Sequence, residues 1–263
     1  MSPFELKMKL ELADDRARFV KKHSMSDKMN VIVTDDGHMH FFDDDGNDIT
    51  KSVESIEDYA FSYCSSLTAV IIPDSVKSIG RDAFSHCTNL TSVIIPDPVA
   101  SIGDYAFRHC SSLKSISIPD SVKSIRNSTF SWCSSLKSIS IPDSVTYIGS
   151  AAFSCCSSLI SIVIPDSVKI IGSGAFHHCE SLKSIVIPDY VNSIGSWTFE
   201  YCTNLASIFM PESITSIGRW AFFSCSNLKS IVFKGKTLEE VKSMDNYPWG
   251  VEDKSSFKAE KKA

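Results

Sequence analysis

A repeat of 23 residues constrains this chain more than any other feature of its sequence. Eight phenylalanines keep this step from Phe61 to Phe222, and eight leucines keep it from Leu67 to Leu228. Eight cysteines do the same: Cys64, Cys87, Cys110, Cys133, Cys156, Cys179, Cys202 and Cys225. A fixed period of roughly 20–50 residues is typical of solenoids, in which each coil packs on the next. We therefore expect one solenoid with flanking ends, although 263 residues would also suit two globular domains.

Each unit reads L-x-x-I-x-I-P-D-S-V-x-S-I-G-x-x-A-F-x-x-C-x-x. The alternating, β-branched start predicts a short strand that ends at proline, because proline cannot donate a ladder hydrogen bond. Pro-Asp-Ser predicts a turn. The spacing of Ala, Phe and Cys predicts one short helix or 3₁₀ turn. The expected fold is thus an α/β solenoid of eight units, with one parallel sheet face and short helical turns behind it.

The unit that runs from Leu113 through Phe130 to Cys133 resembles the BspA-like (treponemal-type) leucine-rich repeat, and all eight units share its pattern. Residues 246–250, Asn-Tyr-Pro-Trp-Gly, are similar to the tail that often closes such arrays in bacterial members. The resemblance implies a leucine-rich repeat fold and a non-catalytic interaction module, several members being surface adhesins. Residues 126–129, Arg-Asn-Ser-Thr, replace the usual Gly-x-x-Ala, so a different local turn is open there.

The ends of the chain lack the repeat. Phe4–Leu12 alternates strictly and predicts a strand, in preference to the helix that the capping-box pattern at Ser2–Glu5 would allow. Val31–Phe42, with Asp-Gly at its centre, predicts a β-hairpin, and Thr237–Met244 predicts a helix. The expected organisation is a β-rich N-terminal cap at 1–52, the solenoid at 53–236, and a C-terminal cap and tail at 237–263.

Charge and hydropathy narrow the class of protein. The formal charge is −5, from 26 basic and 31 acidic residues, which argues against a general nucleic-acid binder or a polybasic membrane-surface protein. No uncharged apolar run approaches the ~18 residues of a membrane span. With no signal peptide or anchor in the sequence as written, we expect a cytoplasmic monomer, or a surface or secreted protein if an upstream signal has been removed.

The cysteines and histidines carry the most obvious chemistry. The cysteine column falls between apolar positions and has no C-x-x-C, and Cys155 makes the total odd at nine. We therefore expect buried, reduced thiols rather than disulfides or a metal site. His86, His109 and His178 precede three of these cysteines and predict a half-exposed aromatic column, with a zinc pair as the weaker alternative. No cofactor and no metal are expected.

An acidic column follows the prolines, and its members are Asp74, Asp97, Asp120, Asp143, Asp166, Asp189 and Glu212. Turn capping by each carboxylate accounts for the column, and a ladder of divalent cations is the alternative. The sequence has no G-x-S-x-G, H-E-x-x-H, Walker loop or G-x-G-x-x-G. Because a solenoid sets like groups in rows, we do not expect an enzyme.

The outer face of the predicted strands is the candidate binding site. Positions 70 and 72 of the first unit should point inward, so position 71 and its equivalents should point outward. The candidate protein-binding residues are Ile71, Ile94, Val163, Val186, Phe209 and Val232, flanked by Lys183 and Lys229. An exposed apolar row beside Ser and Lys is typical of protein-binding surfaces, although β-branched residues also simply favour sheets. The leading hypothesis is a non-catalytic scaffold that binds a protein through this face; the alternative is a secreted or surface adhesin for host or matrix proteins.

Overall fold

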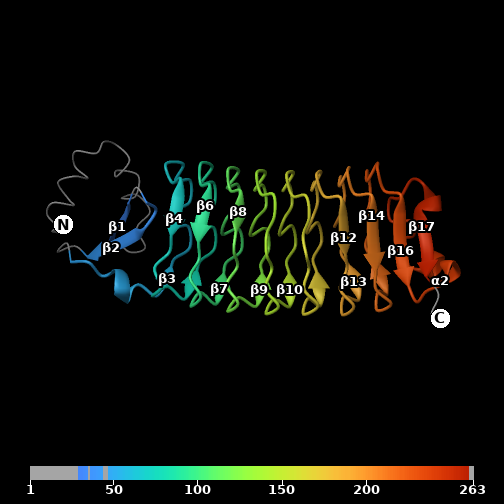
Figure 1. The fold of residues 1–263 in the computed structure, drawn as a ribbon, viewed down its shortest axis with the longest axis horizontal. Helices are drawn as coiled ribbons and strands as arrows, with labels where there is room; N and C mark the ends of the chain where they lie inside the picture. Colours follow the sequence, from blue (N-terminus) through green and yellow to red (C-terminus); the bar gives the residue numbers. More distant parts are fainter. Residues whose placement is uncertain (1–28, 35, 44–46, 261–263) are drawn as a thin grey trace.

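The computed structural model describes residues 29–34, 36–43 and 47–260. The coils stack side by side along one axis, with the hairpin at one end and the C-terminal strand and helix at the other (Figure 1). Parallel pairing at 23-residue steps confirms the solenoid. The strand expected at Phe4–Leu12 lies outside the described residues, and the three-part organisation stays a prediction.

The predicted strands form a front face of parallel ladders. One sheet has the order β4-β6-β8 and a second has the order β12-β14-β16-β17. Their bounds are β4 (Ala69–Ile71), β6 (Ser92–Ile94), β8 (Ser115–Ile116), β12 (Ser184–Val186), β14 (Ser207–Met210), β16 (Ser230–Lys234) and β17 (Phe257–Glu260). Between the two sheets, a single bridge of Ser117 with Ser140 continues the ladder among the described residues.

A second row of parallel strands follows the Pro-Asp-Ser turns, and the prediction of one sheet face was wrong on this point. The row has two sheets, β3-β5-β7 and β9-β10-β11-β13-β15. Their bounds are β3 (Ser55–Ile56), β5 (Ser78–Ile79), β7 (Ser101–Ile102), β9 (Ser124–Ile125), β10 (Tyr147–Ile148), β11 (Ile170–Ile171), β13 (Ser193–Ile194) and β15 (Ser216–Ile217). Each strand buries one isoleucine against the core, which a two-residue extended segment suffices to do.

The segments expected to be helical are turns, so the fold is a β-solenoid rather than an α/β solenoid. In these back turns (residues 58–64 and their equivalents), two residues per coil have positive φ, such as Tyr105 at 60° and His109 at 58°. A left-handed residue at these points interrupts any right-handed helix. The freed amides bond to the next coil instead, as from Phe107 N to Thr129 O at 2.9 Å.

The core is built from columns of identical side chains. The eight phenylalanine rings stack at centroid distances of 5.1 to 5.7 Å, and each is at most 1% exposed. The next column is cysteine, and each thiol from Cys87 to Cys225 donates to the carbonyl of a phenylalanine one coil earlier, at 3.0–3.2 Å. The cysteines therefore satisfy backbone acceptors as well as filling space.

Glycine after the second strand lets adjacent coils approach closely. A Cβ built at Gly103 would lie 2.5 Å from the carbonyl carbon of Gly80. Arg126 occupies this position in its own coil, and the second row of strands is interrupted there, between β7 and β9. The back turn is nevertheless kept, since Ser128 has a φ of 53° like its equivalents. The sequence change at residues 126–129 thus interrupts the second row of strands but leaves the back turn intact.

Replacing Gly195 by alanine should lower the free energy of unfolding by about 3 kcal/mol, because the new Cβ would lie 2.6 Å from backbone atoms of Ser173 that cannot rotate away. Gly174→Ala is the matched control. Its Cβ would meet nothing closer than 3.8 Å, and Ala151 adopts the same backbone one coil earlier at a φ of 53°. Denaturant unfolding should show a cost of about 1 kcal/mol or less for the control. Equal costs would contradict the close-approach account.

Both ends of the solenoid carry additional structure. β1 (Met29–Val33) and β2 (Met39–Asp43) form the predicted antiparallel hairpin, and η2 (Thr50–Ser52) leads into the first coil. The predicted C-terminal helix is α2 (Leu238–Ser243), whose N-terminus has a capping box of Thr237 with Glu240. After α2 the chain forms η3 (Lys254–Ser256) and β17. None of the helices in the described residues is long and apolar enough to cross a membrane.

Candidate functional site

Four predicted residues form an exposed row on the front face, which we call the apolar strip. They are Ile94, Val163, Val186 and Phe209, with exposed fractions of 57%, 80%, 62% and 45%. The neighbouring strand residues point the other way, since Ile185, Ile208 and their equivalents are buried. The prediction of which side of the strand faces outward is therefore confirmed for these four.

Parallel register brings the strip residues into direct contact range. Val186 pairs with Phe209 across β12 and β14, and Phe209 pairs with Val232 across β14 and β16. The backbone bond from Lys183 N to Ile160 O, at 3.3 Å, places the Val163 coil next to the Val186 coil. Val163, Val186 and Phe209 thus lie on three successive coils. Ile94 is separated from them by the coils of Ser117 and Ser140.

The two ends of the predicted row are covered, and their assignment to an exposed face needs correction. Val232 is only 8% exposed, because β17 continues the sheet and sets Lys258 beside it on one side, with Phe209 on the other. Ile71 is half-buried because the hairpin tip docks on β4, where Ile71 N donates to Gly37 O at 2.6 Å. Neither end covering was visible in the sequence pattern.

Polar columns border the apolar strip. Lys183 and Lys229 are exposed at the starts of their strands, as are the equivalent Lys114 and Lys137. Serine occupies the next position of each strand from Ser92 to Ser230. The predicted combination of an apolar row with serine and lysine beside it is thus present on the front face from Val163 to Phe209.

The six aspartates of the acidic column do not cap their turns, contrary to expectation. Each turn is closed by a backbone bond such as Val122 N to Pro119 O at 3.0 Å. The serine after the acidic residue provides the side-chain link, as from Ser144 Oγ to Val122 O at 2.6 Å. The six aspartates are exposed, and Asp189 lies 3.5 Å from Lys234. Within the described residues, no three His, Cys, Asp or Glu side chains are grouped as metal ligands.

The nine cysteines are free thiols in very different surroundings. Seven are buried, and burial raises the pKa of each, for example to about 11 for Cys64 and about 12 for Cys110. Cys225 is half-buried, but burial raises its pKa to about 12 and its thiol donates to Phe199 O at 3.0 Å. Cys155 is half-exposed, and burial also raises its pKa.

Thiol titration should therefore detect about one group, Cys155, in the native protein and all nine after denaturation without reductant. Because only the thiolate reacts and its pKa is raised, the native reaction should be slow near neutrality and accelerate with rising pH. A Cys155→Ser variant should lose the native signal. Fewer than about six thiols in the denatured, unreduced protein would reveal disulfides and contradict the assignment.

The predicted aromatic column on the back is present. Tyr63, His86 and His109 stack at 4.3 Å between successive ring centroids, and Trp132 follows at 5.2 Å. Burial lowers the pKa of both histidines, helped in each case by the charge of Arg108. Burial, and after it the nearby positive charge, therefore disfavours the imidazolium form in this column.

The free energy of unfolding should fall as the pH drops through and below 6.5. His86, His109 and His177 have folded-state pKa values below 6.5, so in that range the unfolded chain binds more protons than the folded one. The variant His86→Tyr with His109→Tyr keeps rings in the column, as Tyr63 shows, and should melt with a weaker pH dependence. Melting at about pH 7.5 and 5.5 tests this. Glu200, whose pKa is raised by burial, works in the opposite sense but equally in both proteins. Identical pH profiles would contradict the assignment.

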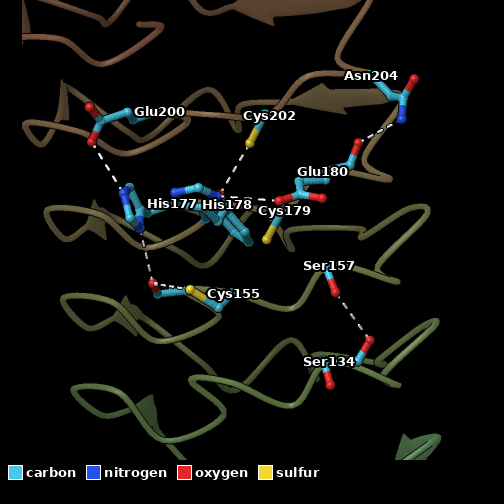
Figure 2. A network of polar contacts seen from close by, with 12 residues as sticks. Ser134, Cys155, Ser157, His177, His178, Cys179, Glu180, Glu200, Cys202 and Asn204 are labelled. Carbon is cyan, nitrogen blue, oxygen red and sulfur yellow. Dashed lines mark hydrogen bonds and ion pairs between the residues drawn. The ribbon is translucent and has the colours of Figure 1, made fainter. Parts of the chain in front are cut away.

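One cluster of unlike polar groups lies on the back and was missed in the sequence analysis (Figure 2). His177 bridges two coils, with Nδ1 3.3 Å from Ser154 Oγ and Nε2 3.2 Å from Glu200 Oε2. Cys155 Sγ lies 3.6 Å from the same Ser154 oxygen. Burial lowers the pKa of His177 and raises that of Glu200. The sequence does contain a signal for this cluster, because Ser154, His177 and Glu200 follow one another at the 23-residue step of the repeat.

The backbone amides beside this Ser-His-Glu arrangement are already engaged. Ser154 is only 8% exposed. An acyl-transfer site also needs amide donors that are free to bind an oxyanion. The three nearest amides are all engaged, those of Ser154, Cys155 and Cys156 donating to Ala151, His177 and Phe153. The cluster therefore serves as a polar link between three successive coils.

Comparison with known proteins finds a family model and several solved structures that are similar to this chain. The model of the BspA type leucine rich repeat region matches residues 47–159 and 146–245. A leucine-rich repeat protein of T. pallidum is 31% identical, covering 79% of this chain and 91% of its own, with a TM-score of 0.49. One from Bacteroides ovatus is 25% identical, covering 88% and 90%, with a TM-score of 0.35. The pneumococcal vaccine antigen PcpA is 20% identical, covering 80% and 72%, with a TM-score of 0.46. No curated protein matches the chain.

The 23-residue coils and parallel ladders define a leucine-rich repeat β-solenoid. Because the family model matches well over half of its length, the chain belongs to the BspA-type leucine-rich repeat family. The resemblance stated from the repeat pattern is thereby confirmed.

Proposed function

We propose that the protein is a non-catalytic scaffold that binds a partner protein through the apolar strip. The observation that carries the proposal is the exposure of Val163, Val186 and Phe209 on three successive coils. A contiguous exposed apolar patch with polar residues around it is typical of protein-binding sites. Lys183 and Lys229 border the row, and such rim charges add more to the association rate than to affinity.

Several features support a binding role over catalysis. The family is one of repeat proteins, the amides of Ser154, Cys155 and Cys156 are all engaged in backbone bonds, and the described residues contain no grouped metal ligands. The alternative role as an adhesin differs in location rather than in the surface used. Fractionation of source cells with protease shaving separates the two, since an adhesin would be recovered only in the shaved surface fraction.

Co-purification from source cells tests the proposal with two matched variants. Phe209→Ser removes an aromatic ring from the front face, and Phe223→Ser removes one of similar exposure from the back. A protein that co-purifies with wild type and Phe223→Ser, but not with Phe209→Ser, and that rebinds when purified, would support the proposal. A partner lost with Phe223→Ser and kept with Phe209→Ser would place binding on the back and contradict it.

A further inference from the structure

We infer that the partner segment on the apolar strip is an amphipathic α-helix that lies along the solenoid axis, with carboxylates on one flank and basic side chains on the other. The inference rests on the proposed function, and it adds the secondary structure and charge pattern of the partner. Three observations carry it: the spacing of the strip, the limited length of the strip and the charges on its two sides.

The spacing of the strip favours a helix over an extended chain. Val163, Val186 and Phe209, the continuous part of the strip, lie one strand spacing apart, about 4.8 Å. The apolar side of a helix repeats every turn, about 5.4 Å, so it drifts by only ~1.2 Å across the three coils. One side of an extended chain repeats every ~6.7 Å, so it drifts by ~3.8 Å, most of one coil, over the same distance. Only the helix can place one apolar residue on each of Val163, Val186 and Phe209.

The length of the strip agrees with a short helical contact. Its continuous part spans three coils, and the exposed Ile160 widens it beside Val163. Serines take its place at 117 and 140 on one side, and Val232 is covered on the other. Two to three helical turns therefore match the apolar part, within which the small drift between 4.8 and 5.4 Å stays tolerable.

Opposite charges line the two sides of the strip. On one side, Lys183 lies three residues before Val186, and Lys137 and Lys229 take the equivalent position one coil beyond each end of the three-coil row, while Ile160 and Ala206 take it beside Val163 and Phe209. On the other side, aspartates lie three residues after Val163 and Val186, at Asp166 and Asp189. All five charged residues are exposed, and Asp189 also lies 3.5 Å from Lys234. Three fully extended residues span about 10 Å, and the aspartates already lie in the turn after the strand, so the two charged rows are at most roughly 20 Å apart. A helix about 10–12 Å in diameter fits between them, with side chains reaching to each row.

Two synthetic peptides of identical composition test the inference on the full chain. Each has about 18 residues. The first sets Leu at helical spacing, with Glu on one flank and Lys on the other; the second has the same residues in strict alternation. Anisotropy of labelled peptide measures affinity, and circular dichroism measures helix gained on binding. We expect the helical peptide to bind at least about tenfold more tightly and to gain helix. Phe209→Ser should weaken binding of the helical peptide about tenfold or more, whereas Phe223→Ser should not weaken it.

The outcomes separate this inference from the proposed function. If both peptides bind equally and Phe209→Ser weakens the binding of both, the strip binds proteins, but the inference that its partner is a helix is wrong. If the helical peptide does not bind below about 1 mM, the inference also fails. If Phe223→Ser weakens binding and Phe209→Ser does not, both the inference and the proposed function are overturned. As a test of the charges, Lys183→Glu should weaken binding of the helical peptide at low salt and should weaken it less at high salt.

Discussion

Phe199→Ala is expected to lower the free energy of unfolding by about 3–5 kcal/mol. The ring is fully buried and lies between those of Phe176 and Phe222, with both centroid distances 5.6 Å. Its loss would leave a cavity inside a column whose neighbours are held at the coil spacing, so the core has little freedom to collapse into the space. Denaturant unfolding followed by circular dichroism measures the loss.

Phe209→Ser is the control for this substitution, because it removes the same ring from an exposed position. We expect it to change the free energy of unfolding by less than about 1 kcal/mol. If it destabilises the protein as much as Phe199→Ala does, Phe209 is a core residue in solution. The assignment of the front face and the proposed binding surface would then both be wrong.

The second large effect concerns binding: Phe209→Ser should weaken the partner complex by about 2 kcal/mol, or roughly 30-fold. Phe209 is the one aromatic residue of the apolar strip, and aromatic side chains are enriched among the residues that dominate binding energy. Val186 pairs with it in register and should contribute less, because its side chain is smaller. Titration calorimetry with the purified partner measures both variants.

Lys183→Ala should change mainly the rate of association with the partner. The lysine is exposed beside the strip, so its removal should slow association and reduce the salt dependence more than it speeds dissociation. Stopped-flow association at two salt concentrations distinguishes this from the effect of Phe209→Ser, which should appear mainly in the dissociation rate.

The repeat made the coil and its inward columns predictable. Because every coil repeats the same environment, a residue type fixed at one position, such as Phe107 or Cys110, had to lie in a column of its own kind, and the structure places both columns in the core. The outward direction of Val186 and Phe209 followed from simple alternation in a strand. These features depend only on local pattern and stacking.

The features that were missed depend on contacts between coils. The back turns look helical in sequence, but left-handed residues such as His109 turn the amides toward the next coil. The second row of strands is only two residues long per coil, too short for a periodicity signal. At the ends, the covering of Ile71 and Val232 by the hairpin and by β17 joins segments that are far from the repeat pattern.

Photo-crosslinking tests the central claim most directly, by placing a benzophenone residue at one of two exposed positions in the full chain. Val186 is 62% exposed on the front face, and Trp132 is 48% exposed on the back. We predict a discrete adduct with the partner from position 186 and none from position 132. An adduct from position 132 and none from position 186 would contradict the claim that the front face binds.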